Sequence, residues 1–346
     1  MAENLGVTCA ICTHNGALRI GPTLESVLIQ KASPDLAWEV LIIDNASTDD
    51  LRGVVSSVWD EERSKISLRI VKEGTLGLSH ARHKAFQEAR FPIISFIDDD
   101  VRVNENWVQA ASDIMSSDTT CGALGGFGIG VFDEPPPQWF ERHQERFVIG
   151  PQGQVSGDVT ETERTLWGAG LTLRMDAINQ LMAEGFVQLL TGRQGNVLLC
   201  GEDTELSLAL RLAGWRIFYE PSLTYEHSLP RERVNWQFMR RWYRGFGAAS
   251  LSFDAYIFAR EAAQGRSVPW YQKRWQCKLL GILLRIFKDP VVLLKALSAQ
   301  CENDDSAVWL EYKLGRLIQL CKIRSQYEKD LATVLNAKWR RELLKR

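Results

Sequence analysis

The sequence lacks the features that define several classes of protein. It has no uncharged apolar run of roughly 18 residues or more, the length that a membrane-spanning helix requires. Neither sign of charge dominates, because 41 Lys and Arg stand against 43 Asp and Glu, so we expect no binding to nucleic acid. With 346 residues, 45% of them apolar, the composition excludes disorder and small disulfide scaffolds. It predicts a globular chain of one large or two smaller domains.

Cysteine is also scarce. The chain has 7 cysteines, an odd number, and no leader that combines charged, apolar and small residues. We therefore expect a reducing compartment and a cytoplasmic location. Cys9 and Cys12 have the CxxC spacing of metal and redox pairs, but they lie in an apolar run. An odd separation along a strand points two side chains to opposite faces, so we interpret both as core residues.

The N-terminal part of the chain alternates apolar runs with helical patterns. The runs predict strands at residues 7–12, 38–43, 66–71 and 93–97. Helices are expected at residues 18–30, 51–59 and 78–89. Ser47 and Asp50 have the spacing of a capping box ahead of the second helix. This alternation predicts an α/β fold with a mostly parallel central sheet, whose ligand lies beyond the carboxyl ends of the strands.

The first loop has neither the GxGxxG nor the GxxxxGKS/T signature of phosphate-binding loops. Polar residues follow the strands instead, and these are Thr13, His14 and Asn15, then Asp44, then Asp98, Asp99 and Asp100. Three adjacent carboxylates repel one another unless a cation neutralises them. In an extended chain, Asp98 and Asp100 would project to the same side. Such oxygen ligands suit Mg²⁺ or Mn²⁺, and a solvated acidic loop is the alternative.

The motifs, taken in order, resemble those of family 2 glycosyltransferases with the GT-A fold. They are CTHN at residues 12–15, LIIDNASTD at 41–49, GLSHAR at 77–82, FIDDD at 96–100, WGAG at 167–170 and GED at 201–203. The resemblance implies an inverting enzyme that takes a sugar from a nucleoside-diphosphate sugar, with a UDP-sugar favoured. The acceptor would be a hydroxyl of a saccharide or of a lipid-linked sugar, in the synthesis of a cell-surface or extracellular polysaccharide.

The resemblance places the nucleotide in the loops that follow the first strands. Thr13, His14 and Asn15 would hold the base, and His14 stands where relatives usually have an aromatic residue. Asp44 would accept a hydrogen bond from the base, although a turn residue at the start of a helix is the alternative. Arg82, on the third helix, would bind the nucleotide.

The acid triplet corresponds to the DXD motif of this fold. By the resemblance, Asp100 ligates the metal ion, and Asp98 and Asp99 lie near the ribose or the donor sugar. His227 follows the last strand of the catalytic region and is the expected second ligand, with a packed or surface histidine as the alternative. The ion, Mn²⁺ or Mg²⁺, would neutralise the diphosphate leaving group.

The resemblance also indicates which residues carry out catalysis and which lie on the acceptor side. Glu202 and Asp203 precede a helical pattern at residues 204–214, where acids are favourable even without a catalytic role. We expect Asp203 to be the general base and Glu202 to orient or contact the acceptor. Trp167 and Gly168 would lie beneath the sugars, and packing of Trp167 in the core is the alternative.

The domain organisation is predicted from where the resemblance ends. We divide the chain into a catalytic domain, residues 1–250, and a helical extension, residues 251–346. Within the catalytic domain, residues 1–103 form the nucleotide half and residues 104–250 the acceptor half. Residues 132–158 fit no regular element and are interpreted as a substrate-side loop that orders on donor binding.

The C-terminal quarter is basic. Residues 269–346 carry 16 Lys and Arg against 8 Asp and Glu. Arg274, Lys278, Arg285 and Lys288 follow a helical spacing. Such a stripe either packs against the rest of the protein or makes a peripheral contact with the inner face of an anionic plasma membrane.

Two other functions remain open at this point. A nucleotidyltransferase would share the nucleotide-binding fold and the metal-binding acids, but it usually has a Gly-rich basic phosphate loop near its first strand. An inactive nucleotide-sugar-binding protein would have lost the DXD acids or the pair Glu202 and Asp203, and both are present.

Overall fold

The computed structural model describes residues 5–60, 65–162, 164–190, 201–288, 290, 293–294 and 302–341. The chain forms two compact units. The first comprises Met1–Val131, His143–Ala183 and Trp215–Ser228, and the second comprises Phe132–Arg142, Glu184–Gly214 and Leu229–Arg346. The predicted boundary at residue 250 falls inside a helix of the second unit, and the division into residues 1–250 and 251–346 stays a prediction.

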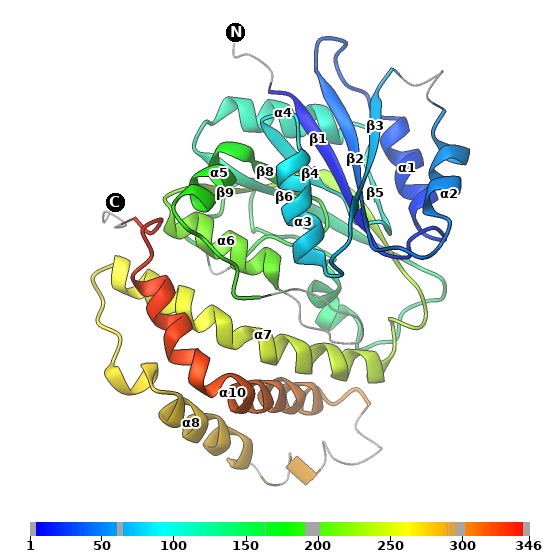
Figure 1. The fold of residues 1–346 in the computed structure, drawn as a ribbon. Coiled ribbons are helices and arrows are strands. Elements are labelled where there is room, and N and C mark those ends of the chain that lie inside the picture. The colour runs from blue at the N-terminus through cyan, green and yellow to red at the C-terminus, as the bar shows by residue number, and fades with distance from the viewer. Residues whose placement is uncertain are drawn as a thin grey trace. The chain divides into compact units, whose positions relative to one another are not determined.

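Within the described residues, nine strands form one mixed sheet in the order β3-β2-β1-β4-β8-β6-β9-β5, with β7 paired to β9 (Figure 1). The strands are β1 (Val7–Thr13), β2 (Trp38–Asn45), β3 (Ser67–Glu73), β4 (Ile93–Phe96), β5 (Val101–Val103), β6 (Cys121–Phe132), β7 (Gly157–Asp158), β8 (Leu171–Arg174) and β9 (Arg216–Leu229). Strands β1 to β4 pair in parallel, whereas β8, β6, β9 and β5 add antiparallel pairs. The α/β fold class is confirmed, with the parallel part limited to the first four strands.

Helices of the first unit pack on the sheet or on one another. They are α1 (Ile20–Leu28), α2 (Leu51–Val58), α3 (Leu78–Glu88), α4 (Trp107–Ser117) and α5 (Met175–Ala183). Strand β2 is buried from Glu39 to Asn45, which explains its continuous apolar run. The predicted capping box is wrong. Asp50 is itself the N-cap of α2 and accepts from the Gly53 amide at 3.0 Å, while the Ser47 hydroxyl accepts from the Asn15 amide.

Of the two cysteines of β1, Cys9 is a core residue, whereas Cys12 is only partly buried. Cys9 is completely buried, and burial raises the pKa of its thiol to about 12. Burial likewise raises the pKa of the Cys12 thiol to about 12. Both thiols are therefore protonated at neutral pH, and the structure records both as free cysteines.

Residues 132–158, which we expected to contain no regular element, include a short 3₁₀ helix and the strand β7, and their role as a substrate-side loop stays a prediction. Trp139 is completely buried and its ring centroid lies 5.4 Å from that of Trp236, in an edge-to-face contact. A short 3₁₀ helix, η1 (Glu141–Phe147), follows, and the Gly150 amide then donates to the Gly128 carbonyl at 2.9 Å. The buried aromatic side chains explain why this stretch is ordered despite its prolines.

Helices build most of the second unit. They are α6 (Glu202–Leu212), α7 (Trp236–Ala263), the 3₁₀ helix η2 (Trp270–Lys273), α8 (Trp275–Phe287) and α10 (Asp305–Leu335). Helices α7 and α10 lie side by side (Figure 1). Gly247 and Gly315 permit this approach, because a Cβ atom on either would collide with a carbonyl of the opposite helix. None of the helices in the described ranges is long and apolar enough to span a membrane.

A buried carboxylate holds α7 and α10 together. Glu311 of α10 is 3% exposed and accepts hydrogen bonds from Arg240 and Arg244 of α7, at 2.7 Å each. Such a charge is tolerated in the interior because it is paired with two cations and hydrogen-bonded at both oxygens.

Helix α8 packs against its neighbours through part of the predicted basic stripe. The Lys278 ammonium lies 2.7 Å from Asp254 of α7, and the Arg274 guanidinium lies 2.7 Å from Glu328 of α10. Ile282 is buried between these elements. Lys278 therefore serves internal packing, as one of our alternatives expected, whereas Arg274 forms an ion pair at the surface.

The opposite face of α8 is apolar and exposed. Leu280, Leu284 and Phe287 follow each other at helical spacing, and their exposed fractions are 58%, 63% and 65%. Arg285 and Lys288 are exposed as well. Of the four cations of the stripe, only Lys278 is drawn inward, and Arg274, Arg285 and Lys288 are exposed.

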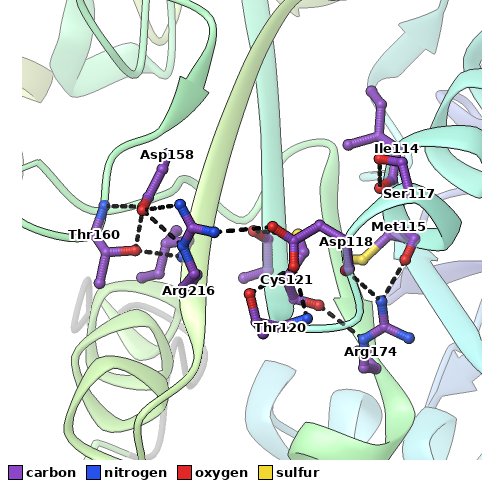
Figure 2. A network of polar contacts seen from close by, with 12 residues as sticks. Ile114, Met115, Ser117, Asp118, Thr120, Cys121, Asp158, Thr160, Arg174 and Arg216 are labelled. Carbon is purple, nitrogen blue, oxygen red and sulfur yellow. Dashed lines mark hydrogen bonds and ion pairs between the residues drawn. The ribbon is translucent and has the colours of Figure 1, made fainter.

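A polar network ties the end of α4 to the antiparallel part of the sheet. Figure 2 shows Arg174 of β8 donating to the carbonyls of Met115, Asp118 and Cys121, the last at 2.9 Å. Arg216 of β9 forms a second centre, with its guanidinium 3.0 Å from the Asp118 carboxylate. Arg174 is 6% exposed, whereas the Arg216 side chain is 36% exposed.

The two arginines should differ in their contribution to stability. Arg174→Met should lower the free energy of unfolding by about 3 kcal/mol, because three buried carbonyls lose their donor. Arg216→Met should cost less than about 1 kcal/mol, because partly exposed ion pairs contribute little. Urea unfolding of both variants measures the difference, and equal losses would contradict this account of the network.

Candidate functional site

The candidate site begins at the carboxyl ends of β1 and β2. The parallel register of these strands sets Thr13 beside Asp44 and so brings the two following loops together. Asn15 has a left-handed backbone, with φ of 50°. Its side-chain oxygen accepts from the Thr48 amide at 2.8 Å, which ties the first loop to the second.

His14 is oriented by the loop after β2. Its Nδ1 donates to the Asn45 carbonyl at 2.8 Å. The side-chain amide of Asn15 donates to its Nε2 at 3.3 Å. Asp44 is 7% exposed and accepts from the Ser47 amide at 3.0 Å. These contacts bring His14, Asn15 and Asp44, which we expected to bind the base, into one cluster of polar loops.

Asn45 is an organising residue that we did not predict. Its side chain donates to the Thr75 carbonyl at 2.7 Å and accepts from the Gly77 amide at 2.8 Å. These bonds fix the loop that enters α3, which carries Arg82. The Arg82 side chain is nearly buried, and its guanidinium lies 5.4 Å from the ring centroid of Phe96. Only the position of Asn45 directly after Asp44 in the sequence could have drawn attention to it.

The acid triplet forms a turn rather than an extended segment. The Val101 amide donates to the Asp98 carbonyl at 3.1 Å, so the chain reverses between β4 and β5. Our expectation that Asp98 and Asp100 project to one side of a strand is therefore wrong. The turn sends neighbouring carboxylates to different partners.

Asp99 faces the first loop. It accepts from the Thr13 hydroxyl at 2.5 Å and from the Arg19 guanidinium at 2.8 Å. Burial raises the pKa of Asp99, although both of these contacts act in the opposite direction. Gly16 leaves room for this arrangement, because a Cβ atom there would collide with Thr13 and Asp99. No local motif marks Arg19, so sequence reasoning missed it.

Asp100 faces His227 across the pairing of β5 with β9. The distance from the Asp100 carboxylate to Nε2 of His227 is 3.6 Å, longer than a hydrogen bond. His227 is 3% exposed, and its Nδ1 donates to the Phe147 carbonyl at 2.9 Å. Because a carbonyl can only accept, Nδ1 is the donor of this bond, and Nε2 is the ring nitrogen that faces the carboxylate. Metal-ligating histidines are commonly oriented in this way.

The residues of this pair fit a divalent ion that keeps other oxygen ligands. In the described part of the chain, no three His, Cys, Asp or Glu side chains gather into a metal cluster. Asp100 and His227 would therefore supply two ligands, and phosphate oxygens and water the others. Mg²⁺ and Mn²⁺ accept such mixed coordination.

Trp167 and Gly168 lie in the loop before β8. The Trp167 amide donates to the side chain of Gln152 at 2.6 Å, and Gln152 in turn donates to the Gly126 carbonyl at 2.7 Å. Trp167 is half-buried and Gly168 is buried. Gln152 is 1% exposed and lies in the stretch that we interpreted as a loop, so its positioning role was missed.

Glu202 and Asp203 start α6 in the second unit. Gly201 precedes them with φ of 116°, and a Cβ atom there would lie 2.7 Å from the ring of Phe253. Glu202 is 5% exposed and its carboxylate accepts from the Gly201 amide at 3.1 Å. Asp203 is half-buried and accepts from the Thr204 amide at 2.7 Å. Asp203 is thus the more accessible acid of the pair.

Glu205, in the same helical turn, is completely buried. It accepts from the amides of Leu189 and Leu190 and, at 2.6 Å, from the Tyr256 hydroxyl. Burial raises its pKa to about 7, even though these hydrogen bonds favour the charged form. This glutamate fastens α6 to α7, and sequence reasoning did not single it out.

The first unit thus holds the predicted nucleotide and metal residues, and the second unit holds the predicted base. The chain belongs to glycosyltransferase family 2. The sequence profile described as Glycosyl transferase family 2 matches residues 8–181, about half of the chain. The chain is also 24% identical over 164 residues to TuaG of Bacillus subtilis (strain 168), a protein assigned to teichuronic acid biosynthesis. That match covers 47% of this chain and 59% of TuaG.

Solved structures place the fold in the GT-A class. The mannosyltransferase PcManGT from Pyrobaculum calidifontis, in complex with GDP-Man and Mn²⁺, has a TM-score of 0.54. It is 17% identical, over 94% of this chain and 88% of that one. TarS of S. aureus, residues 1–349 in complex with UDP-GlcNAc, has a TM-score of 0.51 and is 15% identical, over 94% of this chain and 92% of that one.

Proposed function

We propose that this protein is a metal-dependent, inverting glycosyltransferase. It would move a sugar from a nucleoside-diphosphate sugar, with a UDP-sugar favoured, to a hydroxyl of a saccharide or lipid-linked acceptor in cell-surface polysaccharide synthesis. Family membership supports the transferase class, and the assignment of TuaG supports the kind of product. The nucleotide sugars bound to PcManGT and TarS support the donor class. The observation that carries the proposal is Asp100 facing His227 at the end of the sheet.

The donor would bind in the loops at the carboxyl ends of the parallel strands. Thr13, His14 and Asn15 would hold the base, with Asp44 accepting a hydrogen bond from it. Arg82 would bind the nucleotide. The contacts among these loops support the assignment, because side chains that are already oriented lose less conformational entropy on binding.

Asp100 and His227 would hold Mn²⁺ or Mg²⁺, and Asp98 and Asp99 would lie near the ribose or donor sugar. The bound ion would stabilise negative charge on the diphosphate as the sugar leaves. The Nδ1 contact of His227 with the Phe147 carbonyl keeps Nε2 available as a ligand. The Mn²⁺ in the PcManGT complex supports this choice of ion.

Asp203 would act as the general base that takes the proton from the acceptor hydroxyl. Its partial exposure supports this role over Glu202, which is buried and hydrogen-bonded to its own loop. Glu202 would orient the acceptor, and Trp167 and Gly168 would lie beneath the sugars. Direct displacement with one base inverts the anomeric centre.

Metal binding should depend on the two facing side chains. Asp100→Ala and His227→Ala should each weaken the binding of Mn²⁺ in the presence of UDP by at least about tenfold, measured by titration calorimetry, because each removes one ligand. Asp35→Ala, at an exposed position outside the site, is the control. Donor hydrolysis should stop in excess EDTA, and full activity there would overturn the metal requirement.

Substitution of Asp203 should impair catalysis without impairing nucleotide binding. Asp203→Asn should retain the affinity for UDP but reduce transfer by roughly 10²- to 10⁴-fold, the usual contribution of a general base. Glu202→Gln, tested beside it, should have the smaller effect on the rate. Near-normal transfer by Asp203→Asn would assign the base to another residue.

We also propose that the enzyme is cytoplasmic and contacts the inner face of the plasma membrane through α8. Its exposed side chains Leu280, Leu284 and Phe287 would enter the interface, with Arg285 and Lys288 beside anionic headgroups. Arg274 and Lys278 are already engaged in ion pairs, so they would add little. A lipid-linked acceptor would be presented at such a surface.

Membrane binding should depend on Arg285 and Lys288, because Arg274 and Lys278 are engaged in ion pairs. Each contributes about 1 kcal/mol near an anionic leaflet, so the double variant Arg285→Glu with Lys288→Glu should abolish recovery with anionic liposomes in flotation. Lys322→Glu with Arg324→Glu makes the same charge change at exposed positions of α10 and should float as wild type. Equal recovery with neutral and anionic liposomes would refute the electrostatic contact.

A further inference from the structure

Arg19 stands at the N-cap of α1 and reaches the acid triplet from there. Its backbone is fixed at the helix start, because its amide donates to the Gly16 carbonyl at 2.9 Å and the next residue, Ile20, is completely buried. Its guanidinium contacts the Asp99 carboxylate through two nitrogens, Nε at 3.3 Å and Nη2 at 2.8 Å. None of the roles proposed above uses this arginine.

The same guanidinium also contacts the first loop. Nη1 of Arg19 donates to the Asn15 carbonyl at 3.1 Å, and Nη2 donates to the His14 carbonyl at 3.4 Å. All three guanidinium nitrogens therefore have acceptors within the protein, even though the side chain is 45% exposed. Arg19 thus connects the loop that would hold the base to the turn that would hold the metal ion.

Asp99 is held through both of its oxygens. Oδ1 accepts from Arg19, and Oδ2 accepts from Arg19 and from the Thr13 hydroxyl. A metal ion could bind this carboxylate only by breaking these contacts, and the guanidinium would repel it. Asp100 points elsewhere and faces His227. The triplet therefore contains one acid that a protein cation already neutralises and one that meets the histidine.

We propose that Arg19 is a positioning residue for both loops. It keeps Asp99 turned toward the first loop and away from the metal ion, so that the ion is held at Asp100. It also holds the backbone of His14 and Asn15, whose side chains would contact the base. The assignment of ion and base to these loops rests on the proposed function.

Arg19→Met tests the proposal on the full-length chain. Binding of Mn²⁺ alone is measured by electron paramagnetic resonance, and binding of uridine alone by titration calorimetry. The affinity for Mn²⁺ should rise about fivefold, because Asp99 becomes available as a ligand and the repulsion by the guanidinium is lost. The affinity for uridine should fall about fivefold, the effect of one lost hydrogen bond in its loop. A general loss of structure would instead lower both affinities.

A second variant displaces Asp99 without removing a charge. A Cβ atom at Gly16 would collide with Thr13 and Asp99, so Gly16→Ala should push the carboxylate out of its contacts. It should change the two affinities in the same directions as Arg19→Met. If Arg19→Met does not fold, Gly16→Ala decides the question.

Arg102→Met is the matched control for the loss of charge. Arg102 lies two residues from Asp100 on β5, and its guanidinium is 2.8 Å from Glu226. Its removal should change neither affinity by more than about twofold, because a partly exposed ion pair is screened by solvent. Equal gains in Mn²⁺ affinity for Arg102→Met and Arg19→Met would overturn the proposal, since charge alone would then explain the effect.

The proposal is also overturned if the Mn²⁺ affinity fails to rise in both Arg19→Met and Gly16→Ala, or if the uridine affinity falls in neither. A donor-hydrolysis assay on the same samples separates it from the proposed function. Turnover of a nucleotide sugar together with unchanged affinities in the variants would refute only the role of Arg19. Opposite changes in the two affinities, without turnover of any nucleotide sugar, would support the role of Arg19 and refute the transferase activity.

Discussion

The mutual repulsion of three consecutive carboxylates is the constraint that organises the candidate site. A tight turn resolves it, because the Val101 amide bonds to the Asp98 carbonyl and directs Asp99 and Asp100 to different partners. Asp99 meets Thr13 and Arg19 at the end of β1, and Asp100 meets His227 across β5 and β9. The same turn therefore joins the parallel part of the sheet, where a nucleotide would bind, to the antiparallel part, which supplies the histidine.

In the second unit, buried carboxylates likewise hold separate segments of the chain together. Glu311 pairs with two arginines of α7. Glu205 of α6 accepts one hydrogen bond from Tyr256 of α7 and two from the backbone amides of Leu189 and Leu190. A carboxylate buried in this way holds its hydrogen-bond donors in place, because removal of the carboxylate or of a donor leaves an unpaired polar group in the interior. Asp254 draws Lys278 inward by the same rule, which leaves the exposed face of α8 with fewer cations than its sequence indicates.

The sequence predicts the elements that depend on local pattern. The four parallel strands and their helices lie close to the expected ranges because buried parallel strands need continuous apolar runs. Contacts between distant segments could not be predicted in this way. Arg19, Asn45 and Gln152 acquire their roles only when loops far apart in sequence meet. The 3₁₀ helix within residues 132–158 was not expected, because the stretch has no helical or strand pattern, and the complete burial of Trp139 is set by contacts with distant residues.

The residues proposed for donor binding and those proposed for proton transfer belong to two different units of the chain. The metal and nucleotide residues depend on the sheet of the first unit, whereas Asp203 and Glu202 depend on the contacts of α6 with α7. A substitution at Asp203 removes a charge from the half-buried start of α6, in a different unit from the loops around Asp44 and Asp100. This separation is the physical reason why donor binding and proton transfer can be examined independently, even though one reaction would need both.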